Sequence, residues 1–263
     1  MDAGLTKAPL FKNTDKGLNI NHMAPNLPEH IVPINSEQHL NKKLKPVTNF
    51  AFAADQHAVS IAVHEFSRCA PIFPIIFLKD NEGTEIKPVS LFGMEKGQNL
   101  FVVNGQWGAT YIPAILRRYP FVSIMDEEGG RMGVCVDESS GLLNEEEGTP
   151  LFTETGEPSE ALEKTKRFLG ELSAMETFTR QFCEHLNSLD LFRVLSVSYE
   201  VQGQKKTLGG CHAIDEKKLQ DMDDETFLDL RKKQYLGPIY SHLGSLGQME
   251  KLSHLAARFK KST

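Results

Sequence analysis

Short apolar runs separated by turn residues dominate the first half of the chain. Runs of strand length occur at residues 74–80, 87–94, 100–107 and 132–136. The dipeptide Asn104-Gly105 accepts positive φ at both turn positions and therefore predicts a hairpin that closes near Trp107. Consecutive short strands joined by tight turns favour an antiparallel, meander-like sheet over a parallel one.

The pattern changes to a helical period after residue 151. Apolar residues recur at intervals of three and four from Pro158 to about Asp190, which predicts one long amphipathic helix. Its apolar stripe consists of Leu162, Leu169, Leu172, Met175, Phe182, Leu186 and Leu189. Residues 194–201 then alternate as a strand does, and residues 208–214 form its predicted return strand after a turn at Gln202-Gly203.

Two more helices are predicted near the carboxyl end. One covers residues 227–236, with Asp223 as its N-cap and Gly237 as its stop. The other begins at Pro238 and continues to about Phe259 as a single helix. Residues 55–71 fit both a strand and a helical stripe, so the pattern alone leaves that segment open.

Together these elements predict an α+β protein. Residues 31–150 form its antiparallel-sheet-rich part, and residues 151–263 supply the long amphipathic helix and a strand pair plus helices. Residues 1–30 are rich in Asn, Lys and Pro and are predicted to be a flexible N-terminal arm. The two larger parts are expected to fold as one cooperative unit.

Composition narrows the classes of partner. The formal charge of −6 gives no general attraction to nucleic acid or anionic lipid. No apolar run is long enough for a membrane-spanning helix, and the amino terminus has no apolar signal core. Four scattered cysteines without a CxxC pair are typical of reduced, buried thiols. We therefore expect a cytoplasmic protein with no nucleic-acid partner and no membrane insertion.

Four common catalytic or cofactor-binding motifs are missing from the sequence. GxGxxG, GxxxxGK, GxSxG and HExxH are absent, and Arg68 stands where HExxH would require its second histidine after His64. Asp55, His57 and His64 are the best metal candidates, because residues seven apart on a helix share a face. Histidines that are satisfied by hydrogen bonds are commoner than ligands, so the expectation is no metal and no cofactor.

Two further groups have simple structural interpretations. Cys211 and His212 are adjacent on a predicted strand, so their side chains should point to opposite faces and not form a nucleophilic pair. The acidic run at residues 145–147 is most simply a solvated linker.

The stretch at residues 107–121 concentrates aromatic and cationic side chains. Pro113 suits the first position of a short helix between two strands, and an arginine pair suits its last turn. Aromatic faces pack on sugars or peptides, and guanidinium groups pair with carboxylate or phosphate. The candidate ligand-binding residues are Trp107, Tyr111, Arg117, Arg118 and Tyr119. The alternative is structural, with Trp107 in the core and the arginines paired with carboxylates. An antiparallel sheet could also receive a peptide strand at its edge.

Several segments resemble the SapC-like family, which is named after a protein encoded with a surface-layer system. The resemblance covers nearly everything after Ile31, in the segments IVPINSEQH, FAADQHAVSIAVHEF, FPIIFLKD, PVSLFGMEKGQNLFV, WGATYIPAILRRYPF, CVDESSGLL, GTPLF, GCHAIDEKKLQDMDDETFLDLR and IYSHLGSLGQMEKL. It implies no established reaction and no catalytic residues to transfer. It does imply a setting in Gram-negative-type cells, since relatives are often encoded beside TonB-dependent receptors and halogenase-like or JmjC-like proteins.

The favoured hypothesis is a non-enzymatic binding or accessory protein that engages a peptide, a sugar or a partner protein, linked to TonB-dependent uptake or a cell-surface system. One alternative is a metal- or cofactor-assisted enzyme centred on His57 and His64. Another is a structural subunit of a surface-layer system, and a homo-oligomer is left open. The sequence itself names no reaction.

Overall fold

The structure is a computed structural model that describes residues 30–80, 83–125, 132–201 and 204–259. The predicted arm therefore lies outside the described residues except for His30. The described chain divides into two compact units, one of residues 30–48 and 117–174, the other of residues 49–116 and 175–259. Helix α4 (Glu160–Ser188) contributes residues to both units.

The first unit contains two small antiparallel sheets. The first sheet has the order β1-β9-β8 and the second β10-β2-β11. Leu151 and Phe152 pack with Leu162 and Leu169 of α4 over the first sheet's Phe121 and Val136. The bounds are β1 (Ile31–Pro33), α1 (Ser36–His39), β2 (Lys43–Leu44), β8 (Phe121–Met125), β9 (Met132–Asp137), η4 (Glu138–Ser140), β10 (Leu143–Asn144) and β11 (Thr149–Pro150).

The acidic run is ordered by its basic neighbours in this unit. Lys42 pairs with Glu145 at 2.9 Å, and Lys45 pairs with Glu147. Strand β2 carries the intervening Lys43, which donates to the Glu146 carbonyl at 3.1 Å. The carboxylates are exposed, as expected for a solvated segment, but the backbone around them is a three-stranded sheet and not a free linker.

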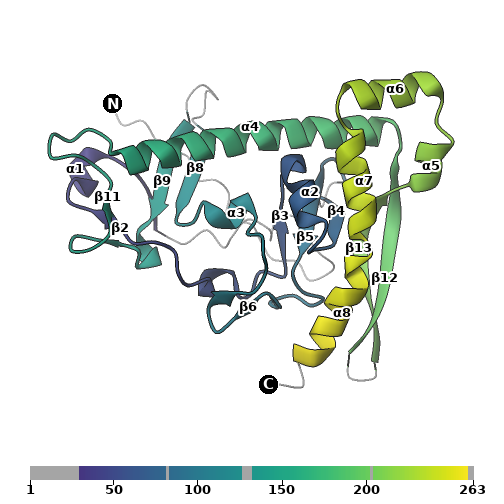
Figure 1. Ribbon diagram of the computed structural model, residues 1–263, viewed down its shortest axis with the longest axis horizontal. Coiled ribbons are helices and arrows are strands. Elements are labelled where there is room, and N and C mark those ends of the chain that lie inside the picture. Colours follow the sequence, from purple (N-terminus) through teal and green to yellow (C-terminus); the bar gives the residue numbers. More distant parts are fainter. Residues whose placement is uncertain (1–29, 81–82, 126–131, 202–203, 260–263) are drawn as a thin grey trace. The chain divides into compact units, whose positions relative to one another are not determined.

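The second unit is built on a five-stranded antiparallel sheet with the order β12-β13-β4-β5-β3 (Figure 1). The strands are β3 (Ala58–Ser60), β4 (Ile75–Lys79), β5 (Ile86–Leu91), β12 (Phe192–Val201) and β13 (Gln204–Ile214). Strand β4 is central and almost wholly apolar, which suits burial on both faces. All strand pairs in the described parts of the chain are antiparallel, so the predicted α+β class is confirmed.

The strand order is not a simple meander. Strands β4 and β5 are neighbours in sequence, but β13 pairs with β4, so that Cys211 lies opposite Leu78. The predicted strand pair near the carboxyl end is confirmed and is longer than expected, and its Gln202-Gly203 turn lies outside the described residues. Its register shifts between Leu195 and Val197, opposite the two glycines of β13.

Helices from the carboxyl end pack on this sheet. Helix α7 contacts β13 and β4, and α8 contacts β12, as Figure 1 shows in yellow. The helices are α5 (Glu216–Gln220), α6 (Asp224–Lys232), α7 (Leu236–Ser245) and α8 (Gln248–Phe259). No helix in the described ranges is long and apolar enough to span a membrane.

The predicted helix boundaries in this region are partly wrong. Asp223 is the N-cap of α6, as predicted, and accepts from the Thr226 N–H at 3.0 Å. That helix nevertheless ends at Lys232, because Gln234 has a positive φ of 62°, and Gly237 lies inside α7. The predicted last helix is divided into α7 and α8 near Gly247.

The open segment at residues 55–71 contains both types of structure. It forms β3, then the 3-10 helix η3 (Val63–Glu65), then α2 (Phe66–Cys69). His57 therefore precedes a strand and His64 lies on a separate short helix, so the argument that they share one helix face was wrong.

The predicted hairpin at Asn104-Gly105 is confirmed. It joins β6 (Val102–Val103) to β7 (Gln106–Trp107), and its turn residues have φ values of 50° and 74°. Beyond it, α3 (Ala114–Arg117) starts directly after Pro113, as predicted. The 3-10 helix η2 (Ala51–Ala53) lies in the same unit as the hairpin.

Candidate functional site

The predicted binding residues fall into both units. Trp107 and Tyr111 belong to the second unit, whereas Arg117, Arg118 and Tyr119 belong to the first. The structure therefore brings Trp107 and Tyr111 together, and it places the three other residues in a separate structural setting.

Trp107 is partly a packing residue. Its indole N–H donates to the Tyr111 carbonyl at 2.9 Å, and its ring lies 5.3 Å from Phe92 and 6.2 Å from Phe73 between centroids. The side chain is nevertheless only half-buried. One part of the indole thus stabilises the fold, and the other part faces outward and can contact a ligand.

Tyr111 is fixed by a buried carboxylate. The Tyr111 hydroxyl donates to Glu65 Oε1 at 2.7 Å, and the Ala114 N–H donates to the same oxygen at 2.7 Å. Glu65 Oε2 accepts from the Ala62 N–H at 3.0 Å. Glu65 is only 4% exposed, so these hydrogen bonds replace water at both of its oxygens. The Tyr111 ring is thus held at its hydroxyl, and the Tyr111 backbone carbonyl is held by Trp107.

Arg68 stacks on that ring. Its guanidinium carbon lies 4.7 Å from the centroid of Tyr111. The side chain is exposed at the end of α2, and it makes no ion pair with a carboxylate within the described ranges. A cation over an aromatic face is attracted by the ring and can still donate hydrogen bonds to another group.

Two further aromatic residues extend the surface beside Trp107. Phe50 lies 5.9 Å from Trp107 and 5.9 Å from Phe52 between ring centroids, and both phenylalanines are half-buried. We call these five residues, Phe50, Phe52, Arg68, Trp107 and Tyr111, the aromatic–arginine cluster. It can contact apolar side chains through its rings and an anionic group through its one cation.

Sequence reasoning missed three members of this cluster and the buried Glu65. The only available signal was the HEFSR segment, where Arg68 occupies the position of a second metal-binding histidine. Nothing in the sequence placed that segment against Tyr111, because the two are separated by more than forty residues of chain.

The three candidates of the first unit have other contacts. The Arg117 guanidinium lies 5.2 Å from the ring centroid of Phe168 on α4. Tyr119 is half-buried, and burial together with the negative charge of Asp137 raises the pKa of its hydroxyl. The peptide bond from Tyr119 to Pro120 is cis. Arg118 is half-buried beside Tyr119 in sequence.

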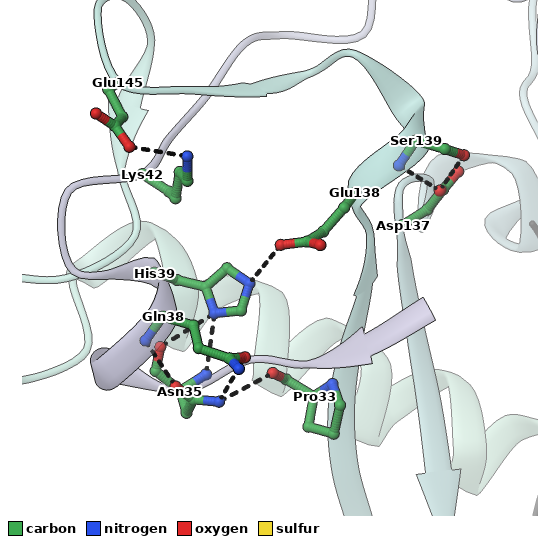
Figure 2. Close-up of polar contacts among 9 residues, drawn as sticks. All are labelled: Pro33, Asn35, Gln38, His39, Lys42, Asp137, Glu138, Ser139 and Glu145. Atoms are coloured by element: carbon green, nitrogen blue, oxygen red, sulfur yellow. Dashed lines mark hydrogen bonds and ion pairs between the residues drawn. The ribbon is translucent and has the colours of Figure 1, made fainter. Parts of the chain in front are cut away.

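A polar cluster in the first unit surrounds His39 (Figure 2). His39 is fully buried, and its Nε2 lies 3.4 Å from the carboxylate of Glu138. Its Nδ1 faces the Asn35 carbonyl at 3.1 Å. Asn35 is also the N-cap of α1 and accepts from the Gln38 N–H at 2.9 Å. These contacts attach α1 to the end of β9.

This cluster does not form a hydrolytic triad. Ser139 donates to Asp137 at 2.6 Å, while His39 faces Glu138, as Figure 2 shows. Asp137 also accepts from the Ser139 N–H at 2.9 Å and is the N-cap of η4, which ends at Gly141 in the left-handed region. Ser139 and Ser140 are thus part of a structural turn.

The predicted metal candidates do not converge. Asp55 and His64 are exposed, and the His64 ring packs against Phe178 at 4.9 Å. No group of three His, Cys, Asp or Glu side chains close enough to hold a metal ion occurs among the residues that the structure describes. His57 is half-buried just before β3.

The Cys211–His212 pair has the arrangement expected of neighbours on a strand. Cys211 is fully buried, and burial raises the pKa of its thiol to about 12. His212 is half-buried, and burial and the charge of Lys79 lower the pKa of its imidazole. A thiol with so high a pKa is a poor nucleophile near neutral pH.

Comparison with known proteins gives a family but no characterised relative. A family model described as SapC matches residues 34–252, which is most of the chain. No curated protein and no solved structure shows a significant match.

Proposed function

The chain belongs to the SapC family, and on that premise we propose that it is a non-enzymatic binding protein that engages a peptide segment of a partner protein through the aromatic–arginine cluster. The supporting observation is the exposed Arg68 guanidinium, which lies over the Tyr111 ring. Glu65 holds that ring by accepting a hydrogen bond from its hydroxyl. A cation held in this way loses little conformational freedom on binding, which favours affinity.

The half-buried rings support the same proposal. Phe50, Phe52 and Trp107 offer apolar area in the same unit as Arg68, and aromatic rings and arginine are enriched at sites where proteins bind one another. The family resemblance implies genes for TonB-dependent receptors nearby, and a protein ligand is compatible with that setting. We therefore expect the ligand to be a protein segment.

Trp107 provides the test. It is the only tryptophan of the chain, so intrinsic fluorescence reports on the aromatic–arginine cluster alone. The full chain is used to select from a library of random twelve-residue peptides, and the enriched peptides are titrated while Trp107 emission is recorded. We expect saturable changes in emission, and weaker binding by Phe52→Ala and Arg68→Gln.

The matched control is Arg231→Gln, which removes an exposed arginine from α6 and should leave the affinity unchanged. Urea unfolding of each variant checks that the fold is retained. Selection of no peptide, or of peptides whose affinity is the same for Arg68→Gln and the wild type, would contradict the proposed function.

A further inference from the structure

We infer that the ligand of the aromatic–arginine cluster carries a carboxylate, and that the Arg68 guanidinium receives it through its outward N–H edge. This inference rests on the proposed function and adds the chemical class of the group that is recognised. It follows from two features of the structure: the position of Arg68 over the Tyr111 ring and the contacts of Glu65.

The Arg68 guanidinium has an aromatic support. Its central carbon lies 4.7 Å from the Tyr111 centroid. The Tyr111 ring cannot turn away without breaking the hydrogen bond from its hydroxyl to Glu65. The guanidinium is itself planar, so its N–H donors match a planar acceptor with two oxygens.

The buried acid that contacts Tyr111 does not form an ion pair with Arg68. Both oxygens of Glu65 already accept hydrogen bonds, from Tyr111, Ala114 and Ala62. Glu65 holds the ring, and no ion pair between it and Arg68 is formed. The positive charge of Arg68 therefore remains for an acid supplied from outside.

A peptide carboxylate has two sources, an acidic side chain and a free C-terminus. Both present the same pair of oxygens to a guanidinium fork, and both are joined to a backbone whose neighbouring apolar side chains can contact Phe50 and Trp107. The structure selects the carboxylate and not its source, so the experiment separates the two.

The experiment uses the full chain and two random twelve-residue peptide libraries, one with free and one with amidated C-termini. If Arg68 receives an acidic side chain, peptides enriched from both libraries carry Asp or Glu at one fixed position. If it receives a C-terminus, only the free-acid library is enriched. In either case, replacing the carboxylate by an amide in a selected peptide should weaken binding about tenfold or more, measured by Trp107 emission.

Substitutions at Arg68 connect this preference to the guanidinium. Selection on Arg68→Gln should lose the carboxylate preference, and Arg68→Lys should retain only part of it, because lysine keeps the charge without the fork. Arg231→Gln should behave as the wild type. The urea unfolding transition of each variant is compared with that of the wild type to check that the fold is retained.

The outcomes separate this inference from the proposed function. If enriched peptides bind near Trp107 but contain no preferred carboxylate, or if the preference survives in Arg68→Gln, the inference fails and the proposed function stands. If neither library yields a peptide that alters Trp107 emission, both are overturned.

Discussion

The Tyr111 hydroxyl donates a 2.7 Å hydrogen bond to the buried carboxylate of Glu65. This contact joins η3 to the loop that precedes α3, and the N–H of Ala114, the first residue of α3, donates to the same oxygen. A carboxylate that receives hydrogen bonds at both oxygens is expected to be an important determinant of the local fold.

Substitution at this pair should reduce stability. Tyr111→Phe removes one hydrogen bond to a carboxylate and should lower the free energy of unfolding by about 1.5 kcal/mol. Glu65→Gln should lower the free energy of unfolding by about 2 kcal/mol or more. The NH2 of the new side chain would face a backbone N–H, and two donors cannot form a hydrogen bond with each other. Urea unfolding measures both. Tyr240→Phe, at an exposed tyrosine, is the matched control and should have little effect.

Acid should destabilise the second unit through His242. This side chain is fully buried on α7, its Nε2 accepts from the Ile214 N–H at 3.1 Å, and burial lowers its pKa to about 3. In the unfolded chain the pKa of this histidine is near 6.5, so as the pH falls the unfolded state binds the proton before the folded state does. The contribution of His242 to the free energy of unfolding is therefore fully present above pH 6.5. It is lost as the pH falls toward 3, by up to about 1.4 kcal/mol per pH unit.

The variant His242→Gln tests this assignment, because it keeps an acceptor for Ile214 and removes the titrating group. Urea unfolding at several pH values between 7.5 and 4.5 should show a steeper loss for the wild type. Equal slopes for the two proteins would show that other groups cause the acid sensitivity.

The cysteines should be unreactive in the folded protein. All four thiols are buried, and burial raises the pKa of Cys135, Cys183 and Cys211. Ellman's reagent at pH 8 should therefore modify them slowly in buffer and all four rapidly in guanidinium chloride. A thiol that reacts at once in buffer would contradict the described burial.

Substitution should be more costly at Gly105 than at Gly97. Gly105 has a φ of 74°, and an added Cβ would lie 2.4 Å from Asn49 Oδ1. Gly97 has a similar φ of 77° but open space around it. Gly97→Ala should thus cost about 1 kcal/mol for the backbone alone, and Gly105→Ala should cost more. Thermal unfolding of both variants measures these costs. Gly97→Ala reports backbone strain alone, and Gly105→Ala reports backbone strain plus the steric clash with Asn49.

Local patterns predicted the elements that depend on neighbouring residues. The stripe of α4 and the turn at Asn104-Gly105 are determined by residues within a few positions of each other, and both were predicted. The end of α6 was missed because Gln234, and not a glycine, adopts the positive φ. Side-chain preference is a weak guide where a non-glycine residue takes that conformation.

Contacts between distant segments could not be predicted in this way. No local pattern placed Arg68 on Tyr111 or β13 beside β4. Proximity in sequence was also misleading, since Trp107 and Arg117 lie ten residues apart and belong to different units. The binding role of Trp107 and its neighbours stays a prediction until ligands are tested.

The discontinuous units also have a consequence for synthesis on the ribosome. The described residues of the first unit are all present once the chain has been made to residue 174. The five-stranded sheet cannot be completed then, because β4 must wait for β13, which ends at Ile214. Phe77 and Leu78 are thus left without their partners on β13 during translation, and this apolar segment of the nascent chain stays exposed to misassociation until β13 is made.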